Sequence, residues 1–299
     1  MTIALVTGGT RGLGKAIATR LSDRGWQVVI AGRDAHKADL VADLSRLDDV
    51  RRLAAEVKAL YPDLMLLVNN ADVSKGSRVV TPDGLETTFA TNHLAPFLLT
   101  NLLLPSKVIN IASEQHRFVR AIPWDDLQGE RRFRPIEQYS LTKLYNVLFT
   151  RELARRAAGR VQVNAVSPGF LRTDLGREAR GGFRVFLTLA QPFQQPPEKG
   201  AESLMPVLDS ELTGAYFRSG KQVVPSALAQ DEDAGARLWK ISRELSGLGA
   251  RLTWSSVARG SVCGLTIRPS SCVSARTSFG LHVGAAGQDS SGWAPRKCP

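Results

Sequence analysis

The chain begins with an apolar stretch that runs directly into a glycine-rich turn. Residues Ile3 to Thr7 have the pattern of a short buried strand, Gly8 to Gly14 supply the turn, and Lys15 to Arg24 follow with helical periodicity. A second apolar strand, Gln27 to Ala31, comes next. Glycines at a helix N-terminus let a phosphate approach free N–H groups and the favourable end of the helix dipole. The pattern predicts a βαβ unit that binds a dinucleotide, with an ordinary tight turn as the alternative.

Apolar strands and helical segments continue to alternate after this unit. Further strands are expected at 39–45, 64–68, 107–111 and 161–166, and helices at 47–60, 84–104, 136–157 and 231–248. Such alternation predicts an α/β fold, a Rossmann-type doubly wound parallel sheet with its sites at the strand carboxyl ends. We expect a single domain over residues 1–248. Residues 249–299, rich in Ser, Gly, Arg and Cys, are expected to be a poorly ordered extension.

Tyr139 and Lys143 stand four residues apart in the predicted helix 136–157. This spacing puts both side chains on one face of the helix. A lysine ammonium beside a phenol favours the phenolate, so we expect Lys143 to lower the pKa of Tyr139 and to make it a proton donor and acceptor near neutral pH. The alternative is an ordinary amphipathic helix with a surface lysine, because Tyr-x-x-x-Lys is a common spacing.

Two arginines near the glycine turn bear on the choice of cofactor. Arg11 lies inside the turn, and Arg33 follows the second strand, where NAD enzymes of this architecture place an acid that bonds the ribose 2′-hydroxyl. Guanidinium groups suit a 2′-phosphate, so the sequence favours NADP(H) over NAD. Asp34, one residue further on, complicates this interpretation, and two ordinary surface arginines are the alternative.

The net charge of +11 is concentrated toward the C-terminus. After Ala250 there are six basic residues and one acidic residue, whereas the basic residues of the body are scattered among acids. This distribution indicates a solvated surface rather than a nucleic-acid interface. No apolar run is long enough for a membrane span and no signal peptide precedes the first strand, so a cytoplasmic protein is expected. The three cysteines lie in the tail without metal-ligand spacing, and no metal site is expected.

Four stretches taken together resemble the short-chain dehydrogenase/reductase family. They are the turn 7–14, Asn69-Asn70-Ala71, Ser113 with Tyr139-x-x-x-Lys143, and Pro168-Gly169 with Thr173. The resemblance extends from about residue 2 to about residue 248. Segments 91–100, 124–129 and 146–153 are similar to the retinol-dehydrogenase-like branch, which includes bacterial ketoreductases that act on aromatic polyketides such as anthracyclines.

The resemblance implies a role for each matching residue. Tyr139 would be the general acid in ketone reduction, Lys143 would lower its pKa and hold the nicotinamide ribose, Ser113 would bond the substrate oxygen, and Asn92 would anchor a water in the proton relay. The implied cofactor-binding residues are Gly8, Thr10, Arg11, Gly12, Leu13, Gly14, Arg33, Asp43, Leu44, Asn70, Tyr139, Lys143, Pro168, Gly169 and Thr173. Without the resemblance, Asn92 reads as a helix residue that satisfies backbone groups and Ser113 as a strand-end cap. His93 and His116 read as structural or exposed residues rather than metal ligands.

Three features depart from the family pattern. Asp72 stands where the family usually has glycine, and its charge could crowd the cofactor groove. The chain between Arg33 and Asp43 is too short for the usual helix plus strand, so the third strand and its helix should be stunted or missing. Residues 104–107 join a helix to a strand almost without a loop.

The expected activity is NADPH-dependent reduction of a ketone or aldehyde of a bulky hydrophobic molecule, by a monomer or homodimer. The apolar segment 181–197, within a loop at 174–198, is a candidate substrate lid, with a packed surface helix as the alternative. A competing hypothesis is a catalytically impaired NADP-binding protein that acts as a scaffold. A third, RNA binding through the basic tail, lacks interleaved aromatic residues.

Overall fold

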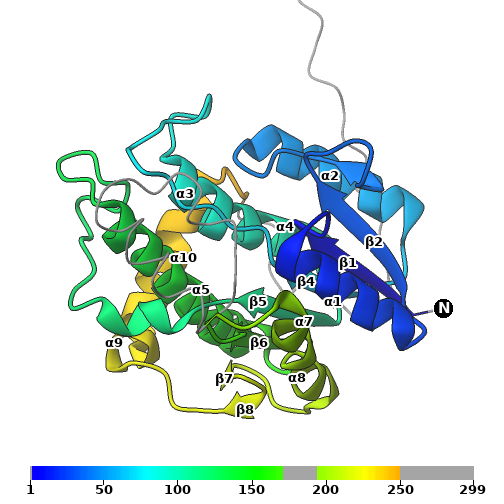
Figure 1. Cartoon of the computed structure of the whole chain (residues 1–299). Helices are drawn as coiled ribbons and strands as arrows, with labels where there is room; N and C mark the ends of the chain where they lie inside the picture. Colours follow the sequence, from blue (N-terminus) through cyan, green and yellow to red (C-terminus); the bar gives the residue numbers. More distant parts are fainter. Residues whose placement is uncertain (1, 171–193, 250–299) are drawn as a thin grey trace, which may run out of the picture. The chain divides into compact units, whose positions relative to one another are not determined.

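The computed structural model describes residues 2–170 and 194–249. Thr173, most of the expected lid and the expected C-terminal extension lie outside these residues. The described chain forms one eight-stranded sheet in the order β3-β2-β1-β4-β5-β6-β7-β8 (Figure 1). The strands are β1 Ile3–Thr7, β2 Gln27–Gly32, β3 Leu40–Val41, β4 Leu64–Asn69, β5 Lys107–Ile111, β6 Gln162–Ser167, β7 Tyr216–Arg218 and β8 Lys221–Gln222. Adjacent strands are parallel except for β7 and β8, so the predicted doubly wound parallel sheet is confirmed.

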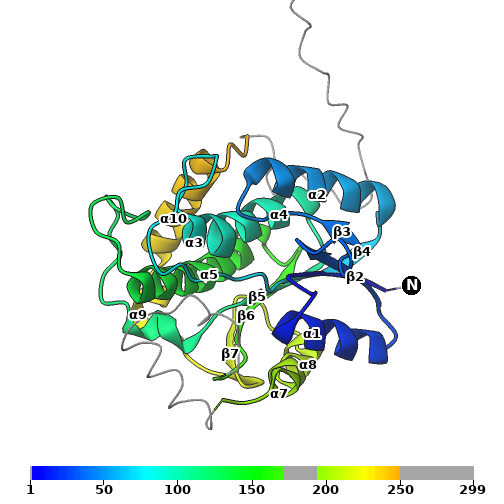
Figure 2. The same cartoon turned by 45° about the horizontal axis from the view of Figure 1, so that its top comes forward.

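Helices cover both faces of the sheet (Figure 2). One face carries α1 Gly12–Asp23, α7 Pro197–Glu202 and α8 Met205–Asp209. The other carries α2 Leu47–Leu60, α4 Ala95–Leu103, α5 Pro135–Ala157 and α10 Glu232–Leu245. The remaining described helical elements are α3 Thr87–Phe89, η1 Ala90–Leu94, η2 Glu114–Phe118 and α9 Ala227–Gln230.

The central strands are apolar throughout because each contributes side chains to two cores. In β1, Leu5 packs on the α2, α4 and α5 side, while Ala4 and Val6 pack on the α1 side. All three are completely buried. Burying a leucine or valine side chain contributes about 1.5–3 kcal/mol, so this alternation anchors the strand whose carboxyl end leads into the glycine turn.

The connection from β2 to β3 is as short as the sequence predicted. β3 has two residues, and a turn replaces the crossover helix. In that turn, Asp34 accepts a hydrogen bond from the His36 amide at 3.1 Å. Asp39 accepts one from the Ile30 amide at 2.7 Å and so closes the turn onto β2. The compressed junction before β5 is also confirmed, since α4 ends at Leu103 and Leu104 takes a left-handed conformation with φ of 52°.

The helical segment expected at 84–104 begins later and is not uniform. Buried Glu86 caps its start by accepting hydrogen bonds from the Thr88 and Phe89 amides, both at 2.8 Å. Residues Ala90–Leu94 form a π-helical turn between α3 and α4. Such turns are rare and occur often at functional sites. Asn92, a candidate from the sequence, lies inside it.

The β7–β8 hairpin was not predicted. Its strands have three and two residues, too few for an alternating pattern to be recognised in the sequence. Ser219 and Gly220 both have positive φ, the two-residue turn that suits the twist of a hairpin.

No helix of the described residues is both long enough and apolar enough to cross a membrane. Nor do the described residues contain a group of three or more His, Cys, Asp or Glu side chains that could hold a metal ion.

Candidate active site

The glycine turn has the backbone that the sequence predicted. Gly8 and Gly12 have φ of 65° and 52°, a region that favours glycine. A Cβ on Gly14 would lie 2.3 Å from the Gly8 carbonyl oxygen, so α1 packs against the turn with no space for a side chain. A Cβ on Gly12 would meet nothing within 4 Å, and the first turn of α1 contains no acidic residue. These residues fit a phosphate group, because the N-terminus of α1 is open and has no competing carboxylate.

Asn70 joins the end of β4 to this turn. Its side-chain amide donates hydrogen bonds to the carbonyl oxygens of Thr7 at 2.8 Å and Gly8 at 3.3 Å. The Thr7 hydroxyl accepts hydrogen bonds from the amides of Asn70 at 3.0 Å and Ala71 at 3.1 Å. Asn70 therefore fixes the shape of the turn through the carbonyl oxygens at its start. Thr7 takes part equally, although sequence reasoning gave it no role.

Asp72 lies between the two residues of the Tyr-x-x-x-Lys motif. Its Oδ2 is 2.8 Å from the Lys143 Nζ, and the Tyr139 hydroxyl donates a hydrogen bond to the same oxygen at 3.0 Å. The Lys143 side chain is 2% exposed and that of Asp72 14% exposed. The Lys143 Nζ is also 5.1 Å from the centre of the Tyr139 ring. The motif residues therefore meet, so the surface-lysine alternative is wrong, and a carboxylate connects them.

The expected effect of Lys143 on Tyr139 is not what the structure shows. Burial, followed by the negative charge and hydrogen bond of Asp72, raises the pKa of Tyr139 well above its ordinary value. The prediction considered the lysine without its counter-ion. Because Asp72 neutralises the ammonium and accepts a hydrogen bond from the neutral phenol, the phenolate gains no net stabilisation here.

Asn92 fastens the chain that follows Asp72. Its side-chain oxygen accepts a hydrogen bond from the Val73 amide at 2.9 Å, and its nitrogen donates to the Val73 carbonyl at 2.8 Å and to the Thr142 hydroxyl at 3.2 Å. Thr142 in turn donates to the Tyr139 carbonyl at 2.7 Å. Asn92 thus connects the π-helical turn, the segment after β4 and α5. Thr142, a residue of α5 between Tyr139 and Lys143, was not identified from the sequence.

Ser113 follows β5 and begins η2, where its hydroxyl accepts a hydrogen bond from the Gln115 amide at 3.3 Å. This is the capping role that the residue alone suggests. Lys143 donates to the Ile111 carbonyl at 3.4 Å, and Asn146 donates to the same oxygen at 3.3 Å. These bonds tie α5 to the end of β5 near Ser113. No hydrogen bond between Ser113 and Tyr139 is present among the described residues, so the substrate-binding role of Ser113 stays a prediction.

Residues expected around the adenosine lie at the ends of β2 and β3. Arg33 is exposed, and its side chain has no hydrogen bond or ion pair with any described residue. The Asp34 carboxylate forms an ion pair with Lys37 at 3.1 Å and accepts a hydrogen bond from the His36 amide. Asp43 accepts hydrogen bonds from the amide and hydroxyl of Ser45, at 3.0 and 2.9 Å, and Leu44 is buried in the core.

The other candidate residues occupy nearby strand ends or the turn. Arg11 is the N-cap residue of α1 and Leu13 packs against the core on the α1 face. The Thr10 methyl group approaches Gly32 so closely that a Cβ there would be 2.8 Å from it. Pro168 is buried after β6, and Gly169 has φ of 97°. The cofactor-binding roles of all these residues remain predictions.

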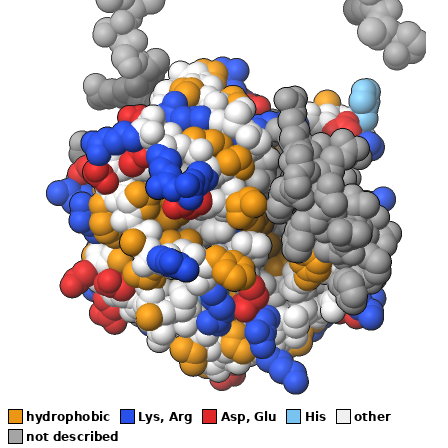
Figure 3. Space-filling model, turned by 60° about the vertical axis from the view of Figure 1, so that its left-hand side comes forward, with side chains coloured by type: hydrophobic (Ala, Val, Ile, Leu, Met, Phe, Trp, Pro, Cys, Tyr) orange, Lys and Arg blue, Asp and Glu red, His pale blue; other side chains and the backbone are white. Residues whose placement is uncertain are grey.

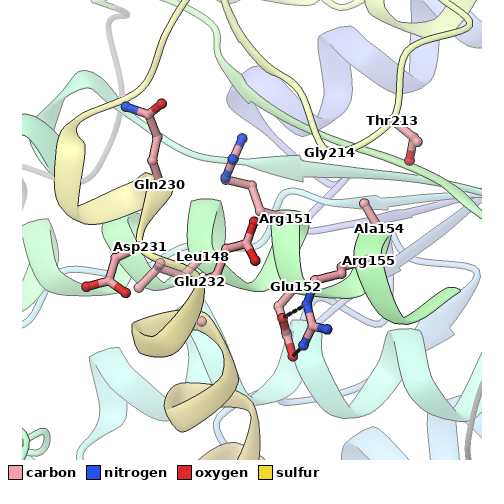
Figure 4. A pocket seen from close by; sticks show the side chains of 11 residues that line it. Leu148, Arg151, Glu152, Ala154, Arg155, Thr213, Gly214, Gln230, Asp231 and Glu232 are labelled. Atoms are coloured by element: carbon pink, nitrogen blue, oxygen red, sulfur yellow. Dashed lines mark hydrogen bonds and ion pairs between the residues drawn. The ribbon is translucent and has the colours of Figure 1, made fainter. Parts of the chain in front are cut away.

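A separate polar cavity of about 210 Å³ lies where α5 and α10 meet the chain before β7 (Figure 4). Its lining residues include Arg151, Glu152, Thr213 and Glu232. Glu152 is already paired with Arg155 at 2.8 Å, as the dashed lines show. None of the residues predicted for the site lines this cavity, so we do not assign the chemistry to it.

The face drawn in Figure 3 carries side chains of both charges. On the face in Figure 3, Lys and Arg side chains are interspersed with acidic and hydrophobic ones rather than aligned in a stripe. Elsewhere in the described chain, Arg20 is paired with Glu202 and Arg24 with Asp209. The basic tail on which the RNA-binding hypothesis rests lies outside the described residues, so that hypothesis is not tested.

Comparison with known proteins identifies the family. The family model for short chain dehydrogenases matches residues 2–182, more than half of the chain. The chain belongs to the short-chain dehydrogenase family. Human retinol dehydrogenase 13 is 36% identical to this short-chain dehydrogenase over 281 residues, covering 82% of this chain and 85% of the relative.

Two crystal structures agree with this assignment. One, of a protein from Mycobacterium paratuberculosis, is 32% identical, has a TM-score of 0.64, and covers 83% of this short-chain dehydrogenase and 94% of that chain. Another, a blue fluorescent protein from a metagenomic library in complex with NADPH, is 25% identical with a TM-score of 0.57, covering 73% and 95%. The chain is therefore an oxidoreductase-family protein with a Rossmann-like fold, and its retinol-dehydrogenase relatives point to interconversion of alcohols and carbonyl compounds.

Proposed function

We propose that residues 1–248 form an NADPH-dependent oxidoreductase that reduces a ketone or aldehyde of a bulky hydrophobic molecule. The observation that supports it most is the contact of Tyr139 and Lys143 with one loop, which Asn70 fastens to the glycine turn. A proton donor and a phosphate-binding turn are thereby connected through three consecutive residues, 70–72.

The open N-terminus of α1 would hold the cofactor pyrophosphate, and Arg33 would meet the 2′-phosphate. Arg33 suits this role because it is exposed and has no partner among the described residues, whereas Asp34 is held by Lys37. A relative with the same fold binds NADPH, which agrees with this preference. When bound, NADPH would supply the hydride.

The residues of the chain would then handle the proton and the orientation of the substrate. Tyr139 would donate its hydroxyl proton to the carbonyl oxygen as the hydride arrives, and Ser113 would hold that oxygen by a hydrogen bond. Lys143 would hold the nicotinamide ribose. Asn92, fixed by Val73, would keep the segment after β4 in place and anchor a water for reprotonation of Tyr139.

We infer a hydrophobic substrate from the apolar composition of segment 181–197, most of which lies outside the described residues. Aromatic polyketides, such as anthracyclines in antibiotic biosynthesis, and retinoid-like molecules both fit this class. The relatives named retinol dehydrogenases support the second of these directly.

The test is NADPH consumption with a panel of aromatic ketones and retinal, for the unmodified protein and for Tyr139→Phe. General acid catalysis contributes about 10²- to 10⁴-fold, so Tyr139→Phe should lose at least about 100-fold in kcat. Tyr61→Phe, which changes a tyrosine at the end of α2, is the matched control and should keep full activity. Equal turnover by the Tyr139→Phe and control variants would refute the assignment.

One observation favours a second possibility, an NADP-binding protein without turnover. Asp72 already occupies the ammonium of Lys143, the group that would hold the nicotinamide ribose. Tight NADPH binding with no turnover on any substrate of the panel would support this alternative.

A further inference from the structure

Asp72 is the one acidic side chain that the described residues bring against both members of the Tyr-x-x-x-Lys motif. A single oxygen, Oδ2, accepts a hydrogen bond from the Tyr139 hydroxyl and pairs with the Lys143 ammonium. The second oxygen, Oδ1, is buried and has no hydrogen-bond partner in the part of the chain that the structure describes. The backbone of Asp72 is fixed on both sides along the chain. Asn70 bonds the glycine turn before it, and Val73 after it is bonded to Asn92.

This arrangement changes what the phenol can do. The neutral phenol is needed to give a proton to a carbonyl, whereas the phenolate is needed to take a proton from an alcohol. A carboxylate at 3.0 Å from the hydroxyl opposes formation of the phenolate in two ways. Its negative charge repels the phenolate, and it accepts a hydrogen bond that only the neutral phenol can donate. It also cancels the charge of Lys143, which would otherwise stabilise the phenolate.

We propose, on the basis of the function proposed above, that Asp72 is a positioning residue that ties Tyr139 and Lys143 through one oxygen and sets the pH at which carbonyl reduction falls off and alcohol oxidation reaches its plateau. Asp72 acts through Tyr139 and need not touch the substrate. It extends reduction toward alkaline pH and confines oxidation to alkaline pH. The raised pKa of Tyr139 agrees with this geometry.

The proposal concerns the pH at which each direction operates and leaves the equilibrium of the reaction unchanged. The ratio of kcat/KM in the two directions is fixed by that equilibrium, which itself includes one proton. A change in the pKa of Tyr139 moves the alkaline limb of reduction and the acid limb of oxidation together. Both limbs should therefore shift by the same amount when Asp72 loses its charge.

The first test needs no turnover. The chain has four tyrosines, so protein labelled with ¹³C at the tyrosine Cζ gives four signals. Tyr139→Phe assigns the signal of Tyr139 by its loss. Comparison of the unmodified protein with Asp72→Asn, both without cofactor, should show the Tyr139 titration at a pH lower by about one unit or more, because one nearby negative charge is gone. Tyr145 and Tyr216, whose burial raises their pKa values, serve as internal references.

Two further variants protect the test. Asp125→Asn removes an exposed carboxylate that is paired with Arg131, and should leave the Tyr139 signal unchanged. Asp72→Gly places at this position the residue that the family pattern leads us to expect there, and remains available should Asp72→Asn fail to fold. A Tyr139 titration that stays in place in the folded Asp72 variants overturns the proposal.

The second test uses pH profiles of kcat/KM in both directions. Below both pKa values, each unit by which the pKa of Tyr139 falls raises the phenolate fraction tenfold. The alkaline limb of reduction and the acid limb of oxidation should therefore both lie about one pH unit or more lower in Asp72→Asn than in the unmodified protein. Unchanged profiles in an active protein overturn the role of Asp72 and leave the proposed function standing. Failure of the proposed function would appear separately, as absence of any Tyr139-dependent turnover.

Discussion

The segment after β4 makes two junctions that differ in chemistry. At one end, Asn70 meets the glycine turn through neutral hydrogen bonds to backbone carbonyls. At the other end, only two residues later, Asp72 meets α5 through a buried ion pair and a charge-assisted hydrogen bond. The first junction sets the shape of the chain. The second sets the charge state of the side chains that would do the chemistry.

The difference teaches where a change of sequence has its effect. Loss of a neutral hydrogen bond to the backbone lowers the free energy of unfolding only modestly, because the carbonyl oxygen left unpaired carries no net charge. An ion left alone in a buried site costs far more than the pair contributes. We therefore expect the Asp72 junction to be sensitive to charge, and the glycine junction to be sensitive to volume.

Lys143→Met is the strongest test of the charged junction. It removes the cation from Asp72, whose side chain is only 14% exposed, and should lower the free energy of unfolding by about 3–5 kcal/mol. The double variant Lys143→Met/Asp72→Asn removes both charges and should recover most of this loss. Urea unfolding of the single, double and unmodified proteins measures both effects. A single variant as stable as the double one would contradict the charged character of this junction.

Gly14→Ala tests the neutral junction by volume. Its Cβ would lie 2.3 Å from the Gly8 carbonyl oxygen, so backbone must move, and overpacking of this kind costs about 1–3 kcal/mol. NADPH affinity should fall with it, because the turn changes shape. Gly12→Ala is the matched control: its Cβ has open space, and only its positive φ costs, at about 1 kcal/mol. Thermal unfolding and NADPH titration of the pair should rank Gly14→Ala as the more harmful.

His93 tests whether sensitivity to charge extends beyond Asp72. This fully buried residue of the π-helical turn bonds Ser242 at 2.8 Å, and burial lowers its pKa to about 3 from 6.5. In the unfolded chain, His93 binds a proton more readily than it does in the folded protein. Above pH 6.5 both states are neutral and stability does not change; as the pH drops toward 3, only the unfolded state gains a proton and the free energy of unfolding falls. At pH 5 the loss is about 2 kcal/mol. The free energy of unfolding is measured at pH 7 and pH 5 for the unmodified protein and for His93→Gln. The decrease between the two pH values should be larger by this amount in the unmodified protein.

Arg33→Ala should have the smallest effect on the fold and a selective one on binding. The side chain is exposed and unpaired among the described residues, so stability should change by less than about 0.5 kcal/mol. NADPH affinity should fall about tenfold, as one charged contact to phosphate is lost, while NADH affinity stays constant. Arg132→Ala, in the chain before α5, is the control. Calorimetric titration with both cofactors decides, and an equal loss for both would exclude a 2′-phosphate role.

The glycine turn of the neutral junction could be predicted from the sequence, whereas the hydrogen bonds of Asn70 to that turn and the charged junction could not. The glycine turn and α2, predicted at Leu47–Leu60 and found there, depend on local backbone preferences and on periodicity. The short β3 followed from chain length alone. The partnership of Asp72 with Lys143 depends on how a loop packs against a helix about 70 residues away, so the sequence showed only an unexpected carboxylate.

The π-helical turn around Asn92 escaped for a related reason. The hydrophobic pattern of residues 84–104 continues through the π-helical turn. A single wider turn inside a helix cannot be recognised from that pattern. The hydrogen bonds of Asn92 to Val73 connect this irregular turn to the site, but they become visible only once β4 and the helix are placed.

Both borders of the sheet are nearly closed to further pairing. The outermost strands, β3 and β8, contain two residues each, so few free N–H and C=O groups are offered to a neighbouring chain. Short outer strands of this kind discourage edge-to-edge aggregation. Should two copies of this chain assemble, continuation of the described sheet from one molecule into the other has almost nothing to build on.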